Sequence, residues 1–185
     1  MSTEFTYHPK QSAPEASKAW LPDGFVPNLH AIMAESPALL EGYKRLWDLS
    51  VGSSLTPLEV QVVMMTANFE NNCHYCVPWH TFIMKQGKMP DGVIDALRSG
   101  EPLPDAKLDA LRTFTRLLIE NRGHAGDDAL AAFFDAGYTQ KHALDVVLGL
   151  AVKLMSNYTN AITHTKLDDP PKQYDWTKPQ AAASS

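Results

Sequence analysis

Residues 55–82 read LTPLEVQVVMMTANFENNCHYCVPWHTF, and the interpretation of the whole chain depends on this stretch. It opens with a capping box at residues 56–59 (TPLE), in which the Thr hydroxyl and the Glu carboxylate each bind a backbone N–H group, with proline at the first helical position. The residues that follow, through Phe69, are apolar on nearly every side, which is typical of a helix buried at the centre of a domain. The sequence therefore predicts a central helix that ends at the Asn71-Asn72 pair.

The second half of the stretch contains the two cysteines of the chain, Cys73 and Cys76, followed by His80. We expect Asn72 to cap a helix that runs from Cys73 to about Lys85, so that both cysteines and His80 share one face. A helix N-terminus and a neighbouring imidazole both favour the thiolate, and such surroundings lower a cysteine pKa from about 8.5 to about 3.5–7.5. The pair is thus equipped for two-electron thiol chemistry, in which one sulfur becomes sulfenic acid and the other closes a disulfide.

The residue pattern by itself leaves other interpretations of Cys73, Cys76 and His80 open. Glu70 precedes Cys73 by three positions, where it either reaches the same pocket and orients His80 or remains a solvated carboxylate. A structural zinc site would need four ligands, so another histidine would have to join Cys73, Cys76 and His80. A purely structural disulfide would add little constraint across so short a loop, and two inert core cysteines are the last possibility.

The rest of the chain also follows a helical pattern. No segment alternates apolar and polar residues over the length of a strand, which predicts an all-α fold with a single helical domain. We expect an extended N-terminal arm over residues 1–28, a helical domain over 29–167 and a loose, proline-rich tail over 168–185. Further helices are expected near residues 36–47, 90–97, 105–122, 127–136 and 139–164.

The composition limits the classes of function. A chain of 185 residues with 44% hydrophobic and 20% charged residues is the size and composition of one globular domain. Its 16 basic and 21 acidic residues give a net charge of −5, which argues against a nucleic-acid groove or a polybasic membrane surface. The sequence has no apolar run of about 18 residues and no signal-peptide pattern at its start, so we expect a cytoplasmic protein.

The cysteine motif also supports a resemblance to a known family. Cys73-His74-Tyr75-Cys76, followed by His80 and preceded by the apolar helix that opens at Leu55-Thr56-Pro57-Leu58-Glu59, resembles the alkylhydroperoxidase D-like branch of the carboxymuconolactone decarboxylase superfamily. The similarity is strongest over about residues 50–85. It extends over 30–165, where the helical layout and the Asn157-Tyr158-Thr159-Asn160 segment also look like the family.

The resemblance implies an all-helical fold that assembles into trimers, or into dimers and hexamers. It implies a peroxidase or disulfide oxidoreductase of antioxidant defence that uses no metal, haem or other cofactor. By the same resemblance Cys76 attacks the hydroperoxide, Cys73 resolves the sulfenic acid and His80 belongs to a proton relay. Electrons would come from a dithiol partner, either a dihydrolipoyl protein or a thioredoxin-like protein.

The sequence departs from the family pattern at one position of the relay. The relay glutamate of the family lies twelve residues before the first cysteine, where this chain has Gln61, and we expect Glu70 to substitute for it as a fourth catalytic residue. Two rival functions remain. One is a lyase like the carboxymuconolactone decarboxylases, which generally lack the cysteine pair, and the other is a non-enzymatic oligomer that senses redox state.

Overall fold

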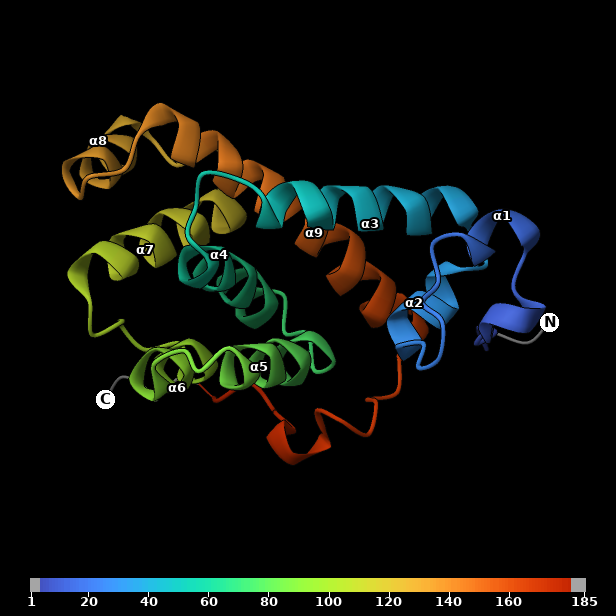
Figure 1. Cartoon of the computed structure of the whole chain (residues 1–185). Coiled ribbons are helices and arrows are strands. Elements are labelled where there is room, and N and C mark those ends of the chain that lie inside the picture. Colours follow the sequence, from blue (N-terminus) through green and yellow to red (C-terminus); the bar gives the residue numbers. More distant parts are fainter. Residues whose placement is uncertain (1–3, 181–185) are drawn as a thin grey trace.

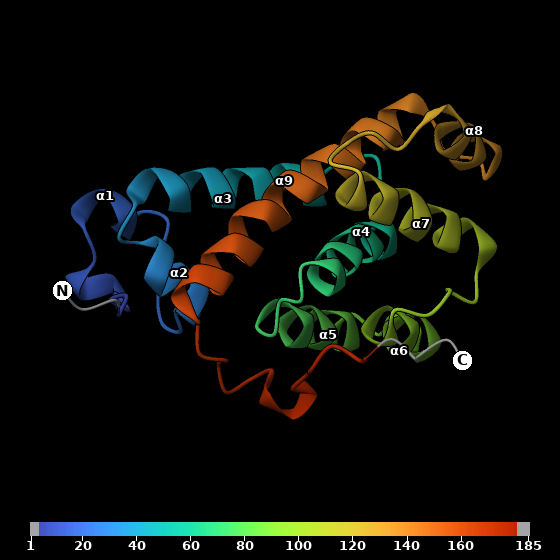
Figure 2. The ribbon, with the colours of Figure 1, turned by 180° about the vertical axis from the view of Figure 1, so that it is seen from behind.

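In a computed structural model that describes residues 4–180, the chain folds into helices joined by short loops, and these residues contain no β-strand (Figures 1 and 2). The prediction of an all-α fold is confirmed. The helices are η1 (Lys10–Ser12), α1 (Glu15–Lys18), α2 (Asn28–Met33), α3 (Pro37–Val51), α4 (Pro57–Glu70), α5 (Cys76–Gln86), α6 (Asp91–Ser99), α7 (Ala106–Glu120), α8 (Asp127–Asp135), α9 (Gln140–Thr163) and η2 (Lys172–Tyr174). None of the helices in the described part of the chain has the length and apolar character needed to cross a membrane.

Helix α4 forms the centre of the molecule and contacts α5, α6, α7 and α9 (Figure 1). The predicted capping box is present: the Thr56 Oγ1 atom accepts the Glu59 N–H at 3.3 Å, and the Glu59 carboxylate accepts the Thr56 N–H at 2.8 Å. Every residue from Glu59 to Asn68 is buried, because neighbouring helices surround α4 on all sides. This explains why the apolar residues of α4 follow no single face.

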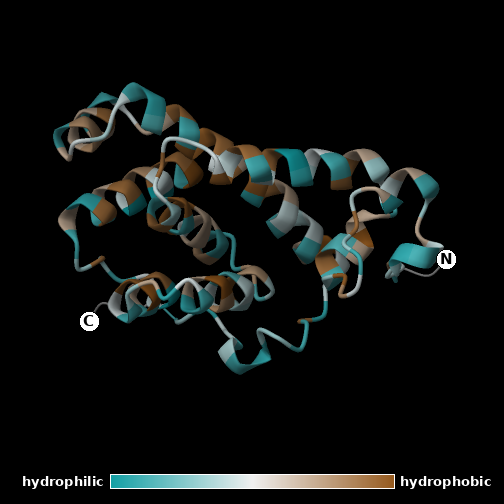
Figure 3. Ribbon diagram, in the orientation of Figure 1, coloured by the Kyte–Doolittle hydropathy of each residue, from teal (hydrophilic) through white to brown (hydrophobic). Residues whose placement is uncertain are grey.

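Helix α9 is the longest helix and packs against both α3 and α4. After a hydrophilic first turn, its residues 146–152 are strongly apolar, and brown colour predominates in this part of the helix in Figure 3. Gly149 allows the close approach of α4, because a Cβ atom at this position would lie only 2.9 Å from the Val63 Cγ1 atom. The contact fixes the rotation of α9, which determines which of its side chains face the cysteines.

The segment after α9 differs from the loose tail expected from its prolines. It runs beneath α5 towards α6 in both views of the ribbon (Figures 1 and 2). Trp176 is 8% exposed and donates its indole N–H to the Arg98 carbonyl at 2.8 Å. Asp168, the first residue of the expected tail, is buried and anchors the segment to α5. Residues 181–185 of this prediction lie outside the described residues.

The N-terminal arm also packs against the helical domain. It contains the short helices η1 and α1, and its Ser17 and Leu21 side chains are buried. The His8 N–H donates to the Ala31 carbonyl of α2 at 3.0 Å. Helix α2 begins at Asn28 and spans fewer than two turns, which is too short for an apolar repeat to reveal it in the sequence.

Candidate active site

The turn between α4 and α5 places the two cysteines differently from the prediction. Asn72 has a left-handed backbone (φ 50°), which Asn tolerates better than most residues, and it ends the α4 turn instead of capping α5. Helix α5 begins at Cys76, so Cys73 lies in the preceding turn and the prediction of a helix from Cys73 is wrong. No side chain forms a regular cap here; instead the Cys76 N–H donates to the Cys73 Sγ atom at 3.2 Å.

Two amides from α9 hydrogen-bond the Cys76 sulfur. Asn157 Nδ2 lies 3.1 Å and Asn160 Nδ2 lies 3.2 Å from Cys76 Sγ. The Asn157 side chain is held in this orientation because its oxygen accepts a 2.9 Å hydrogen bond from Asn71. Asn160 Nδ2 also lies 3.8 Å from Cys73 Sγ, so a single amide spans both sulfurs.

These contacts give the two cysteines different pKa values. Burial opposes ionisation of Cys76, but hydrogen bonding with Cys73, the charge of Lys153 and the two amides outweigh it and lower the Cys76 pKa to about 6. Burial and the neighbouring Cys76 instead raise the pKa of Cys73. Cys76 is therefore the thiolate near neutral pH, and Cys73 remains a thiol.

His80 lies one turn after Cys76 but hydrogen-bonds neither sulfur. Its Nδ1 atom lies 2.8 Å from Gln61 Oε1 and its Nε2 atom lies 3.0 Å from Lys153 Nζ. An amide oxygen only accepts, so Nδ1 carries the proton and Nε2 accepts from the ammonium. Burial, followed by the charge of Lys153, lowers the His80 pKa well below its usual value, so the ring is neutral.

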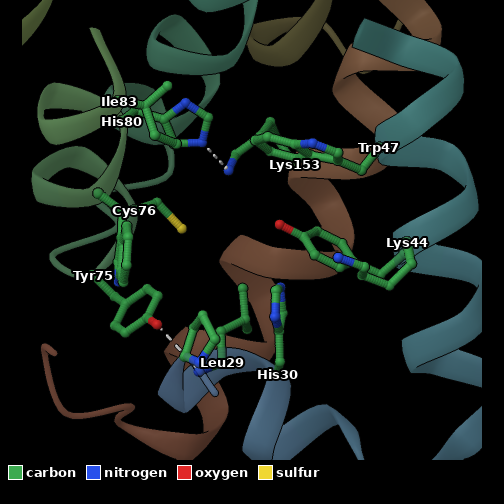
Figure 4. A pocket seen from close by; sticks show the side chains of 12 residues that line it. Leu29, His30, Lys44, Trp47, Tyr75, Cys76, His80, Ile83 and Lys153 are labelled. Carbon is green, nitrogen blue, oxygen red and sulfur yellow. Dashed lines mark hydrogen bonds between the residues drawn. The ribbon is translucent and has the colours of Figure 1, made fainter. Parts of the chain in front are cut away.

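Cys76 opens onto a cavity of about 230 Å³, which we call the Cys76 cavity (Figure 4). Cys73 is not part of its lining and lies behind Cys76. The lining is largely aromatic or aliphatic and contains no Asp or Glu: Pro27, Leu29, His30, Tyr43, Lys44, Trp47, Tyr75, Cys76, Trp79, His80, Ile83 and Lys153. Although Cys76 is only 2% exposed, a small molecule that enters this cavity meets its sulfur.

Glu70 is not brought together with the other predicted site residues. It lies at the end of α4, outside the lining of the Cys76 cavity, and its carboxylate is 3.7 Å from the Lys178 ammonium. The turn at Asn71-Asn72 separates Glu70 from the face of α5 that carries Cys76 and His80. The charged group beside His80 is a lysine from α9, and no carboxylate takes the place of Gln61.

The zinc alternative is not supported by the arrangement of the described residues. Residues 4–180 contain no group of three or more His, Cys, Asp or Glu side chains placed to hold a metal ion. Both nitrogens of His80 are already bound to Gln61 and Lys153. The set of Cys73, Cys76 and His80 therefore does not converge on one point.

Lys153 is the functional residue that the sequence analysis missed. It is 1% exposed and lies on the face of α9 that also carries Asn157 and Asn160. A signal was present, because a lysine interrupts the apolar run LGLAVKLM at a position of the helix that faces the core. Residues 157–160 are singled out in the sequence only by the family resemblance. Their contact with the sulfurs requires the docking of α9.

Comparison with solved structures relates the fold to known proteins. No family model matches the chain, and no curated protein matches it. A peroxidase-related protein from Ralstonia eutropha, described as an alkylhydroperoxidase AhpD core, superposes with a TM-score of 0.78 at 18% identity, over 90% of this chain and 94% of that chain. The debrominase Bmp8, solved with 2,3,4-tribromopyrrole, gives a TM-score of 0.73 at 16% identity over 94% of this chain and 96% of its own.

A third solved structure agrees with these two. A peroxidase-related protein from Silicibacter sp. TM1040 gives a TM-score of 0.69 at 20% identity over 78% of each chain. The similarity covers most of each molecule and is a similarity of fold. The chain therefore has the fold of these AhpD-like and peroxidase-related proteins.

Proposed function

We propose that this protein is a thiol-dependent peroxidase that reduces organic hydroperoxides through the Cys73–Cys76 dithiol. The observation that carries the proposal is the asymmetry of the two sulfurs: Cys76 lines the cavity and has the lowered pKa, while Cys73 lies behind it as a thiol. A nucleophile that is already ionised and a neighbouring resolving thiol are what two-electron reduction of a peroxide requires. The AhpD-like fold supports the same assignment.

The reaction proceeds in three balanced steps. The Cys76 thiolate attacks the terminal oxygen of R–O–OH, the O–O bond breaks, and the leaving RO⁻ takes a proton from the Lys153 ammonium, which yields an alcohol and Cys76 sulfenic acid. The Cys73 thiol then displaces the hydroxyl of the sulfenic acid as water and closes a disulfide. A dithiol of the dihydrolipoyl or thioredoxin type reduces the disulfide by exchange and is itself oxidised.

His80 serves in this scheme as a positioning residue. It is neutral and accepts a hydrogen bond from Lys153, so it holds the ammonium without competing for the proton. Gln61 fixes the orientation of the imidazole from the other side. This arrangement supplies a proton donor next to the nucleophile without a carboxylate.

The proposal is tested by hydroperoxide consumption with excess dihydrolipoamide. Wild-type protein should consume cumene hydroperoxide and form a Cys73–Cys76 disulfide that is visible by mass spectrometry. The Cys76→Ser variant should lose the activity, and Cys73→Ser should stop at sulfenic acid, which dimedone traps. Equal consumption by wild type and Cys76→Ser would refute the peroxidase.

The aromatic lining of the cavity favours reductive dehalogenation as a second candidate. The structural neighbour Bmp8 is described as a debrominase, and the Cys76 cavity has the volume and the largely aromatic or aliphatic lining to hold one ring. Here the Cys76 thiolate would take the halogen, the ring carbon would keep the bond electrons and accept a proton, and Cys73 would displace halide as the disulfide forms. Bromide release from a bromopyrrole in the presence of dithiol, measured against hydroperoxide turnover, distinguishes the two activities.

A further inference from the structure

One side of the Cys76 cavity carries polar groups that have no partner. In Figure 4, Cys76 and His80 lie on α5, Lys44 lies across the cavity on α3, and His30 lies on α2 at its base. Within residues 4–180, the Lys44 ammonium forms no ion pair and no hydrogen bond, and the His30 Nδ1 atom is buried without a partner. The Tyr43 hydroxyl also has no hydrogen-bond partner among these residues.

These three side chains are close neighbours. The rings of His30 and Tyr43 lie 5.7 Å apart between centroids. Burial, with the nearby charge of Lys44, lowers the His30 pKa to about 4, so that His30 is a neutral ring with one N–H to donate. Burial and the negative charge of Cys76 raise the pKa of Tyr43, so its hydroxyl keeps its proton. Together they form a cluster of three donors, which we call the α2–α3 donor cluster.

The polar groups on the other sides of the cavity are satisfied. Lys153 donates to His80, and the Tyr75 hydroxyl donates to Asp168 at 2.5 Å, outside the cavity. The charge of Lys153 acts on the Cys76 thiolate. Since no Asp or Glu lines the cavity, the charge of Lys44 is left without a counter-charge.

The other lining residues indicate the size and polarity of the rest of a ligand. The rings of Trp47 and His80 are in tilted contact with centroids 5.8 Å apart, and Leu29, Ile83 and Trp79 complete an apolar wall. A cavity of about 150 Å³ accommodates one benzene ring in another protein. A volume of about 230 Å³ therefore accommodates one ring with a short substituent at each end.

We propose that the substrate of this site is a small aromatic monoanion, an aryl carboxylate whose reducible group lies at Cys76 Sγ and whose carboxylate is bound by Lys44, Tyr43 and His30. This inference rests on the proposed function for the reducible group and on the α2–α3 donor cluster for the anion. In the peroxidase reaction the substrate would be a carboxylated aryl hydroperoxide, reduced to its alcohol by the steps given above.

Binding of unreactive analogues tests the anion site without turnover. Calorimetry on the reduced protein should show para-isopropylbenzoate binding about tenfold or more tightly than para-isopropylbenzyl alcohol, as expected for a charge-assisted contact. Lys44→Met should abolish this preference and Tyr43→Phe should reduce it. Lys88→Met, which removes an exposed lysine far from the cavity lining, is the matched control and should preserve it. Equal binding of acid and alcohol by wild type, or a preference that survives Lys44→Met, overturns the inference.

Measurements of turnover distinguish a failure of the anion-site inference from a failure of the proposed peroxidase function. The ratio of kcat/KM for the para-carboxylate of cumene hydroperoxide to that for cumene hydroperoxide should exceed about ten in wild type and fall towards one in Lys44→Met. A ratio near one in an active wild type overturns the anion site while the peroxidase stands. If neither hydroperoxide is consumed but the benzoate preference depends on Lys44, the peroxidase fails while the anion site stands.

Discussion

The Cys76 sulfur is surrounded by hydrogen-bond donors and a cation, which stabilise its negatively charged thiolate form. Its pKa is lowered from 9.0 to about 6, so between these two pH values Cys76 is a thiolate where an unperturbed cysteine is still a thiol. We expect the rate of Cys76 alkylation by iodoacetamide to rise with pH around a midpoint near 6. Lys153→Met should move that midpoint up by about one to three pH units, because a nearby cation of this kind lowers a thiol pKa by that much.

The control for this measurement is Lys88→Met, whose exposed side chain lies outside the cavity lining. It should reproduce the wild-type profile. A wild-type midpoint above pH 8, or one that Lys153→Met leaves in place, would contradict the role of the buried lysine.

Gln61 offers a second test at the scale of one residue. Its side-chain oxygen lies 2.8 Å from His80 Nδ1. In Gln61→Glu a carboxylate at this position stabilises the imidazolium, so the His80 pKa should rise, as followed by the NMR shifts of the ring. The added negative charge should also raise the Cys76 pKa and slow peroxide reduction at pH 7. Gln61→Met, which removes the hydrogen bond without adding charge, separates the charge effect from the loss of the contact.

Among the elements, the contact between α4 and α9 determines whether the site forms. A Cβ atom on Gly149 would meet Val63 Cγ1 at 2.9 Å, and the β-branched valine has little freedom to move away. Gly149→Ala gains about 1 kcal/mol of helix propensity but should cost about 1–3 kcal/mol in overpacking, so we expect a small net loss of stability. Chemical denaturation measures this loss.

The new methyl group should also push α9 away from α4 and so weaken the contact of Asn157 and Asn160 with Cys76. The Cys76 pKa should therefore rise in Gly149→Ala. Adding Val63→Ala makes room for the new methyl group, and the double variant should recover part of both effects. Additive losses in the two single variants would show that the two residues do not interact.

Local features of the elements were predicted well from the sequence. The capping box at Thr56 depends on residues three positions apart, so it appears in a linear pattern. The start of α5 was missed because Asn72 adopts a left-handed backbone that ends one helix before the next begins. No local rule distinguishes this conformation from a cap.

The composition of the site was predicted only in part, for a related reason. Cys73, Cys76 and His80 lie close together in the sequence and were identified there. Besides Cys73, the groups that lower the Cys76 pKa come from α9, far along the chain, and their positions depend on the packing of α9 against α4. Glu70 was chosen for its sequence distance from Cys73, but the turn after α4 directs it to Lys178.

For the whole molecule, one side of α9 remains uncovered by residues 4–180. Large apolar side chains along it are between 49% and 71% exposed, and none of them is charged: Leu144, Val147, Leu154, Tyr158 and Ile162. These five residues are spaced by three, seven, four and four positions, so they follow one face over almost the full length of the helix, as at a helix–helix interface. We propose that a second copy of this chain covers this surface through the same stripe, since a two-fold interface pairs a surface with itself.

Sedimentation tests this assembly. The wild type should sediment as a dimer or a larger assembly, and Leu154→Glu should shift it to the monomer without loss of helicity in circular dichroism. Leu49→Glu changes an exposed leucine of α3 instead and serves as a control for the general effect of a surface charge. A monomeric wild type at micromolar concentration would contradict the proposed interface.

The start of α2 and the segment that follows α9 meet beside the Cys76 cavity, around Asn28 and Asp168. The buried Asp168 carboxylate accepts the Tyr75 hydroxyl, the Trp79 indole N–H at 2.9 Å and the Asn28 N–H at 3.1 Å. A chain truncated after residue 167 should expose Trp79 to solvent, which a red shift of tryptophan fluorescence would show, and should lose thermal stability. Truncation after residue 180, which leaves Asp168 and Trp176 in place, is the matched control. Equal spectra for the two truncations would show that Asp168 does not hold this wall of the cavity.

The distribution of the site along the chain also matters during protein synthesis. Cys73 and Cys76 leave the ribosome well before Lys153, Asn157 and Asn160 are translated, and the groups that lower the Cys76 pKa include these α9 residues. On the nascent chain both cysteines are ordinary thiols with little tendency to be oxidised. The reactive sulfur therefore arises only when translation has supplied α9.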